Sequence, residues 1–295
     1  MFRRGVAANP SYGCRADRGV DVALPGPLAV SYGKCWISPE RNPKVFVAAT
    51  TRCFAELPLD AALQRLVDLE YTCMEIMIHE TGGHLRPSEV LADLDRAVMQ
   101  CRQTHRLTAV AFSVDIDLPD SDDRYYDQFV ACCRLAKASK VVTLTVRSAE
   151  LGTPFNAEVE RLRTLVAIAT MEGARVGLLT ETGRMTQDPD TAVVLCDAVK
   201  GLGISLDPSY YVCGPHRNGN YEQVMKHTYH VRLRDTTKDQ LQVRVGQGLI
   251  EYGRLISQLA KYRYDRALCV DIMPMQDVDQ QAEMRKMRLL LESLL

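Results

Sequence analysis

The chain has 295 residues, of which 46% are hydrophobic and 25% charged, the composition of a globular protein with a sizeable core. Its formal net charge of -1 gives no electrostatic reason to expect a nucleic acid or an anionic membrane as its partner. No apolar run reaches the length that spans a bilayer. The ten cysteines are scattered without a CxxC pair, which favours a reducing compartment and hence a cytoplasmic location.

Residues 1–43 show no periodicity and are rich in Gly, Pro, Arg and Tyr. We interpret them as an irregular N-terminal extension. It either docks on the rest of the chain, through Trp36 and the apolar run Leu28–Val30, or has no fixed structure. The start Met-Phe-Arg-Arg is followed by neither the apolar core nor the cleavage site of a signal peptide, so none is expected.

From Lys44 onwards, short apolar runs alternate with amphipathic, helix-like segments. Eight strands are expected: 45–49, 72–78, 107–114, 141–146, and four more that end at Glu181, Asp207, Asp235 and Asp271. Eight strand–helix units in about 250 residues predict a (β/α)8 TIM barrel over residues 44–295. A doubly wound open sheet is the alternative, and it is less favoured because the first βα turn lacks a glycine-rich phosphate loop.

Acidic groups end several of these strands, and the carboxyl ends of barrel strands meet at one mouth. Glu181, Asp207 and Asp271 are therefore expected to converge there, whereas Asp235 is expected to order the loop that follows it. Three carboxylates in a partly buried site repel one another and need a positive group. That group is either a divalent cation such as Mn²⁺ or Mg²⁺, or Arg232, which strand alternation points into the same site.

Other polar side chains on the strands are candidates for binding a substrate. His79 ends the second strand, and His230 points inward on the seventh as either a substrate donor or a core histidine. Arg234 could bind a phosphate or a carboxylate, with Arg147 as a weaker candidate for the same task. Glu75 also points inward, and a structural ion pair with a neighbouring strand is favoured over a substrate contact.

Six segments, taken in order, resemble the xylose isomerase-like TIM barrels: V-D-L-E-Y-T-C-M-E-I, L-L-T-E, L-D-P-S, H-V-R-L-R-D, V-G-Q-G-L-I-E-Y and C-V-D-I. The most specific is the G-Q-G-x-I run ahead of an amphipathic helix, and the resemblance covers about residues 44–295. The superfamily includes sugar isomerases, ketose 3-epimerases, inosose dehydratases and apurinic endonucleases. The endonucleases use more histidine ligands than this chain offers, so DNA repair is not expected.

In the epimerase branch, the resemblance implies a metal held by Glu, Asp, His and Glu, with the two Glu residues moving the proton. Glu181 and Asp207 match the first two ligands. Arg232 stands where the ligating His would be, Asp271 where the last Glu would be, and Tyr210 where a substrate-binding His would be. The implied acid/base pair is thus Glu181 and Asp271, in a chain that departs from the pattern at three of five positions.

The resemblance implies a sugar or polyol isomerase or epimerase that transfers a proton next to a carbonyl, on a substrate with or without phosphate. Two versions stay open: a metal on Glu181, Asp207 and Asp271, or a metal-free site in which Arg232 stabilises an enediolate or an anionic group. The alternatives are a dehydratase or lyase of the same superfamily and a catalytically inactive carbohydrate-binding barrel. The expected partner is a small carbohydrate, and assembly into a homo-oligomer is left open.

Overall fold

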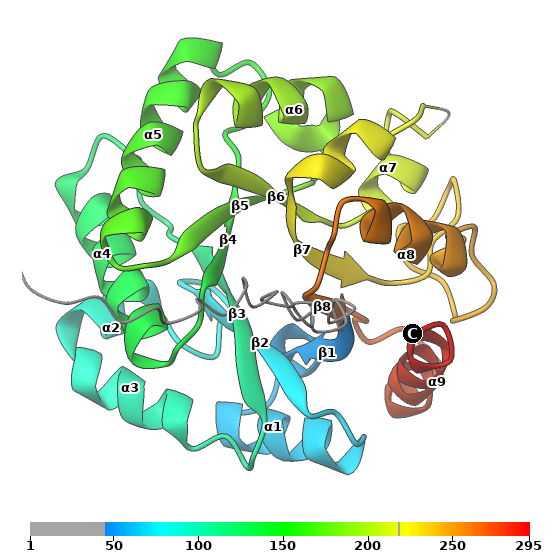
Figure 1. Cartoon of the computed structure of the whole chain (residues 1–295). Coiled ribbons are helices and arrows are strands. Elements are labelled where there is room, and N and C mark those ends of the chain that lie inside the picture. The colour runs from blue at the N-terminus through cyan, green and yellow to red at the C-terminus, as the bar shows by residue number, and fades with distance from the viewer. Residues whose placement is uncertain (1–44, 218) are drawn as a thin grey trace, which may run out of the picture. The chain divides into compact units, whose positions relative to one another are not determined.

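The structure, a computed structural model, describes residues 45–217 and 219–295. Eight parallel strands follow one another in chain order and close into a barrel, with β8 paired to β1 (Figure 1). This confirms the predicted (β/α)8 fold, while the expected extension over residues 1–43 lies outside the described residues. The strands are β1 (Phe46–Thr50), β2 (Cys73–His79), β3 (Thr108–Asp115), β4 (Thr143–Arg147), β5 (Arg175–Leu179), β6 (Leu202–Leu206), β7 (Thr228–Leu233) and β8 (Ala267–Val270).

Helices surround the barrel and cover the outer face of the sheet (Figure 1). None of them, within the described part of the chain, is long and apolar enough to cross a membrane. The α-helices are α1 (Leu59–Asp68), α2 (Pro87–Ala92), α3 (Leu94–Arg102), α4 (Asp123–Ala138), α5 (Phe155–Met171), α6 (Pro189–Ala198), α7 (Ser209–Cys213), α8 (Tyr252–Lys261) and α9 (Gln280–Glu292); 3-10 turns are η1 (Thr51–Phe54), η2 (Met185–Gln187) and η3 (Glu222–His227).

Local sequence signals explain where several helices begin. The side chain of Asp188 accepts the backbone N–H of Asp190, and Pro189 occupies the first helical position of α6. Asp279 caps α9 in the same way, through the N–H of Ala282. The described strands have no comparable capping residues. Their positions are set by alternate side chains that are buried against the helices in one continuous apolar core.

The inside of the barrel changes character along its axis. At the amino ends of the strands, Ala48, Ala267 and Cys269 form a small apolar cluster. Above it the buried interior is mostly polar, with Glu75, Ser113, Thr145, Ser205, His230 and Arg232 all at most 5% exposed. Barrels of this kind usually fill this space with Val, Ile and Leu. Buried polar groups are costly unless they bond to one another, so this interior must be a connected polar network.

Asp235 organises the loop between β7 and α8, as the sequence predicts. Its Oδ2 accepts the backbone N–H groups of Gly246 at 2.7 Å and Gly248 at 3.0 Å. The backbone of Gly248 lies so close that a Cβ there would be 1.9 Å from Asp235 Oδ1 and 2.6 Å from the nitrogen of Thr236. Only glycine allows this approach, which accounts for the second glycine of the G-Q-G run.

Gly248→Ala should therefore destabilise the fold by about 1–3 kcal/mol, because the added methyl group has no space and must displace Asp235. Gly253→Ala is the matched control, since a Cβ at this exposed helical position would meet only Leu294 Cδ2 at 3.9 Å. It should be neutral or stabilising by up to about 1 kcal/mol. Urea unfolding of both variants checks this, and equal stabilities would contradict the role given to the loop.

Candidate functional site

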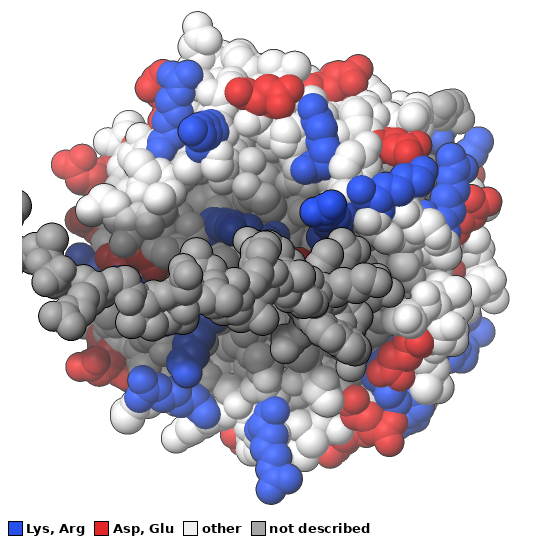
Figure 2. Space-filling view, viewed as in Figure 1, with Lys and Arg blue, Asp and Glu red and all other residues white. Residues whose placement is uncertain are grey.

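A cavity of about 300 Å³ lies at the carboxyl ends of the strands. Its polar lining includes Arg52, His79, Asp115, Arg147, Glu181, Tyr210 and Arg232, of which four belong to strands and three to the segments that follow β1, β5 and β6. Arginines and carboxylates thus face the same cavity, and acidic and basic side chains are also mixed over the outer surface that Figure 2 shows. The cavity is therefore polar and of mixed sign.

A buried ion pair forms the floor of this cavity. Arg232 on β7 donates from Nε to Glu75 Oε2 at 2.9 Å and from Nη2 to Glu75 Oε1 at 2.5 Å. Burial alone would raise the pKa of Glu75, but the charges of Arg232 and His230 outweigh it and hold that pKa well below its usual range. Glu75 thus forms the expected ion pair, although its partner strand β7 lies across the barrel from β2 and is not a neighbour.

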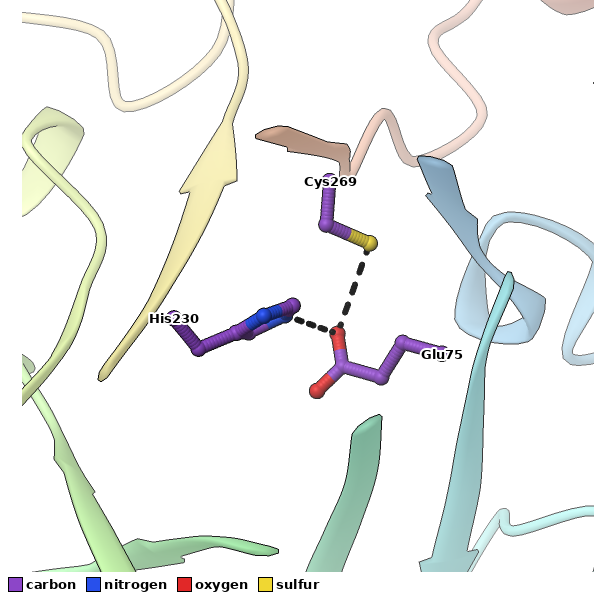
Figure 3. Close-up of side chains that lie close together, drawn as sticks. All are labelled: Glu75, His230 and Cys269. Carbon is purple, nitrogen blue, oxygen red and sulfur yellow. Dashed lines mark hydrogen bonds and ion pairs between the residues drawn. The ribbon is translucent and has the colours of Figure 1, made fainter. Parts of the chain in front are cut away.

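Glu75 also meets His230 and Cys269, as Figure 3 shows. His230 Nε2 lies 3.3 Å from Glu75 Oε2, and the Cys269 thiol donates to the same oxygen at 3.6 Å. Among the described residues this is the one group of three whose ligand atoms all lie within metal-binding reach, within 4.8 Å of one another. His230, a predicted substrate-binding residue, lies beneath the cavity in this cluster and does not line it.

The Glu75 cluster does not fit a metal ion. Both carboxylate oxygens of Glu75 already accept hydrogen bonds from Arg232, whose fixed positive charge would repel a cation. Burial raises the pKa of the Cys269 thiol well above its usual value, whereas a metal requires the thiolate. We interpret the cluster as a buried hydrogen-bond network that sets the position of Arg232.

Two of the three predicted mouth carboxylates do come together, around a different arginine from the one expected. Arg234 Nη2 donates to Asp207 Oδ2 at 2.6 Å and to Asp271 Oδ2 at 2.7 Å, and all three side chains are buried. Arg52 Nη1 adds a second positive charge 3.6 Å from Asp271. Burial would raise the pKa of Asp271, but Arg234, Arg52 and Arg232 together lower it. The counter-ion of this pair is thus Arg234 and not Arg232.

Glu181 lies apart from that pair, in a second ion-pair group. Arg147 donates to its two oxygens at 2.8 and 2.7 Å and reaches Asp115 at 3.3 Å. The Glu181 side chain is 15% exposed and lines the cavity, whereas Asp207 and Asp271 are fully buried and do not. The described residues therefore do not place Glu181, Asp207 and Asp271 at the mutual spacing of one metal site.

Two neutral polar side chains complete the cavity wall. His79 Nε2 lies 2.7 Å from Ser113 Oγ. Burial, with the positive charges of Arg232 and Arg52, lowers the pKa of His79 to about 3, so its imidazole is neutral at pH 7. Burial, with the charge of Asp207, raises the pKa of Tyr210 above its usual value of 10, so its phenol keeps its proton.

The predicted substrate-binding residues fall into two groups, those that line the cavity and those that do not. His79, Tyr210 and Arg232 line the cavity, whereas His230 and Arg234 lie behind it. Arg147, a weaker candidate from the sequence, also lines the cavity, as do Asp115 and Arg52, which the sequence did not single out. Arg147 and Asp115 are the last residues of β4 and β3, so the rule that selected Glu181 would have found them. Arg52 sits in the turn after β1 without a recognisable motif.

The comparisons with known proteins agree with this fold. The sequence model of the family described as xylose isomerase-like TIM barrel matches residues 63–292. A xylose isomerase domain protein from Alicyclobacillus acidocaldarius has a similar structure, with 14% identity, a TM-score of 0.67, and coverage of 85% of this chain and 98% of that one. A xylose isomerase-like protein from Mycobacterium smegmatis, solved in complex with magnesium, has 15% identity and a TM-score of 0.66, covering 84% and 97%.

The 3-keto-D-glucoside 4-epimerase from E. coli also has a similar structure, with 14% identity and a TM-score of 0.64, covering 85% of this chain and 99% of that one. At these identities the structures show the shared fold alone. A comparison with curated protein sequences gave no match. The family match and the closed barrel agree over most of the sequence, and this chain belongs to the xylose isomerase-like TIM-barrel family.

Proposed function

We propose that this protein is a metal-independent isomerase of a small sugar or polyol, with Glu181 as the group that moves the proton. The observation that carries the proposal is that Glu181 both lines the cavity and is held through two hydrogen bonds by Arg147. A cavity of about 300 Å³ suits a small molecule. Similar structures include proteins named L-ribulose 3-epimerase and 3-keto-D-glucoside 4-epimerase, which supports a carbohydrate as the substrate.

The chemistry follows from the groups that line the cavity. Glu181 takes the proton from the carbon next to the carbonyl, and the electron pair left behind forms an enediolate. Arg232 is always charged and has N–H donors beyond the two that bind Glu75, so it stabilises the negative oxygen. Return of the proton to the neighbouring carbon, with transfer of the hydroxyl proton between the two oxygens, completes the isomerisation. His79 and Tyr210 orient the substrate as neutral hydrogen-bonding groups.

The position of the carboxylates favours an isomerase over an epimerase. Inverting a carbon through two bases requires one on each face of the substrate, whereas moving a proton between neighbouring carbons needs only one. Glu181 and Asp115, the two carboxylates of the described residues that line the cavity, both bind Arg147 and so lie on one side of it. Asp271, the implied second base, is fully buried, with Arg234 and Arg52 against it. Elimination of water, as in a dehydratase, is compatible with the same single base.

A carbohydrate-binding barrel without catalysis is the second candidate. The observation that favours it is that every carboxylate described above at the mouth already bonds to a guanidinium group. For either function we propose a cytoplasmic location, because the eight cysteines in the described part of the chain are free thiols.

Full-length protein treated with EDTA and incubated in D₂O with a panel of aldoses and ketoses should incorporate deuterium next to the carbonyl of one of them. The products should be aldose–ketose isomers and not epimers. Glu181→Gln should lower the exchange rate at least about a hundredfold, because the amide cannot accept the proton. Nuclear magnetic resonance of the sugars measures both the rate and the product.

Glu150→Gln is the matched control, because this carboxylate is 77% exposed beside Arg184, outside the cavity, and the exchange rate should not change. Saturable sugar binding without exchange would identify a binder and contradict the enzyme. An equal loss in both variants would remove Glu181 from its proposed role. Formation of an epimer would show that a second base reaches the substrate.

His79 should make stability depend on pH. In the unfolded chain it takes up a proton below about pH 6.5, whereas in the fold its pKa is about 3, so it opposes folding increasingly as the pH falls through this range. Between about pH 7.5 and pH 5, wild type should lose on the order of 2 kcal/mol more stability than His79→Gln. Urea unfolding at both pH values measures the difference, and parallel losses would contradict a neutral, buried His79.

A further inference from the structure

A single nitrogen atom bridges the carboxylates of Asp207 and Asp271. Arg234 Nη2 lies 2.6 Å from Asp207 Oδ2 and 2.7 Å from Asp271 Oδ2. The carboxylates follow β6 and β8, and Arg234 follows β7, the strand that lies between them in the barrel. The nitrogen therefore occupies the point where a cation shared by the two carboxylates would sit.

The surroundings of this pair are those of a binding site and not of a surface salt bridge. Both carboxylate side chains are fully buried, and Arg234 is 3% exposed. Asp207 Oδ1 is fixed by the backbone N–H of Ser209 at 3.0 Å and by the Ser209 hydroxyl. Asp271 Oδ1 has no hydrogen-bond partner among the described residues, so one buried oxygen is left over for a ligand.

The charges explain why a divalent ion does not fit here. Asp207 and Asp271 carry two negative charges, and Arg234 with Arg52 carries two positive ones. A guanidinium group cannot lose its charge in a protein, so an added Mn²⁺ or Mg²⁺ would meet two permanent cations. The metal would also have to displace Arg234 Nη2 from both carboxylates.

We propose that Arg234 is a built-in cation that replaces a divalent metal in this barrel, and that Asp207 and Asp271 form a latent Mn²⁺ site which Arg234 keeps closed. Oxygen ligands of this kind suit Mn²⁺ once the guanidinium group is removed. The inference concerns metal binding alone, so it does not depend on the sugar substrate or on Glu181.

Mn²⁺ binding, followed by the loss of the free-ion electron paramagnetic resonance signal, tests the proposal. EDTA-treated wild type should bind no Mn²⁺ at concentrations of up to roughly 1 mM. Arg234→Ala should bind one ion per chain, with a dissociation constant at least about tenfold below that concentration. Arg234→Ala/Asp271→Asn should lose this binding. Arg244→Ala, an exposed arginine of the β7–α8 loop, is the control and should behave as wild type.

Stoichiometric Mn²⁺ binding by wild type that is lost in Asp207→Asn would overturn the proposal, and so would a folded Arg234→Ala that binds no metal. Removing Arg234 leaves two buried carboxylates less well compensated, which can make folding of the variant depend on the ion. In that case Mn²⁺ should raise its thermal midpoint, and no rise would count against the latent site. Arg234→Lys keeps the charge and should fold without binding Mn²⁺; binding there would equally contradict the proposal.

Discussion

The central constraint on this barrel is that three carboxylates buried inside it are balanced by arginines of the chain itself. Glu75 is paired with Arg232 on the floor of the cavity, and Asp207 and Asp271 are paired with Arg234 behind it. A buried carboxylate that is left uncompensated would cost several kcal/mol, so these three require a cation, whereas Asp235 is satisfied by backbone N–H groups. Supplying that cation from β7 fixes the charge of the interior permanently, which an exchangeable ion would not do.

This choice determines what remains available for chemistry. Arg234 removes Asp207 and Asp271 from the cavity, while Arg232 reaches its surface with a permanent charge that can stabilise an oxyanion. Glu181 remains as a wall residue, positioned by Arg147. The carboxylates that line the cavity among the described residues thus lie on one side of it, and this asymmetry links the buried ion pairs to the isomerase that we propose.

Much of the fold could be predicted from the sequence, because strand alternation and helix periodicity are local properties. The strands ending near Glu181, Asp207, Asp235 and Asp271 lie where the pattern places them, and the Asp235 loop follows from the G-Q-G run. The pairing of the arginines could not be predicted in this way. Arg232 and Arg234 point to the same side of β7, and only the barrel's closure decides that the first meets Glu75 across the interior.

How deeply each side chain is buried could not be predicted from the sequence either. Glu181 and Asp271 both end strands, yet one lines the cavity and the other is fully buried. Arg52, which lies against Asp271 from the turn after β1, is placed there only by the tertiary structure. The resemblance to metal-binding relatives could not predict this difference in burial either, because Asp271 is a position at which this chain departs from the family pattern.

Anomalous scattering from wild-type crystals soaked in Mn²⁺ would test the replacement of the metal by arginine most directly. We expect no anomalous peak between Asp207 and Asp271, with the guanidinium group of Arg234 in density between the two carboxylates. A peak about 2.0–2.6 Å from both carboxylates, with Arg234 turned away, would contradict it.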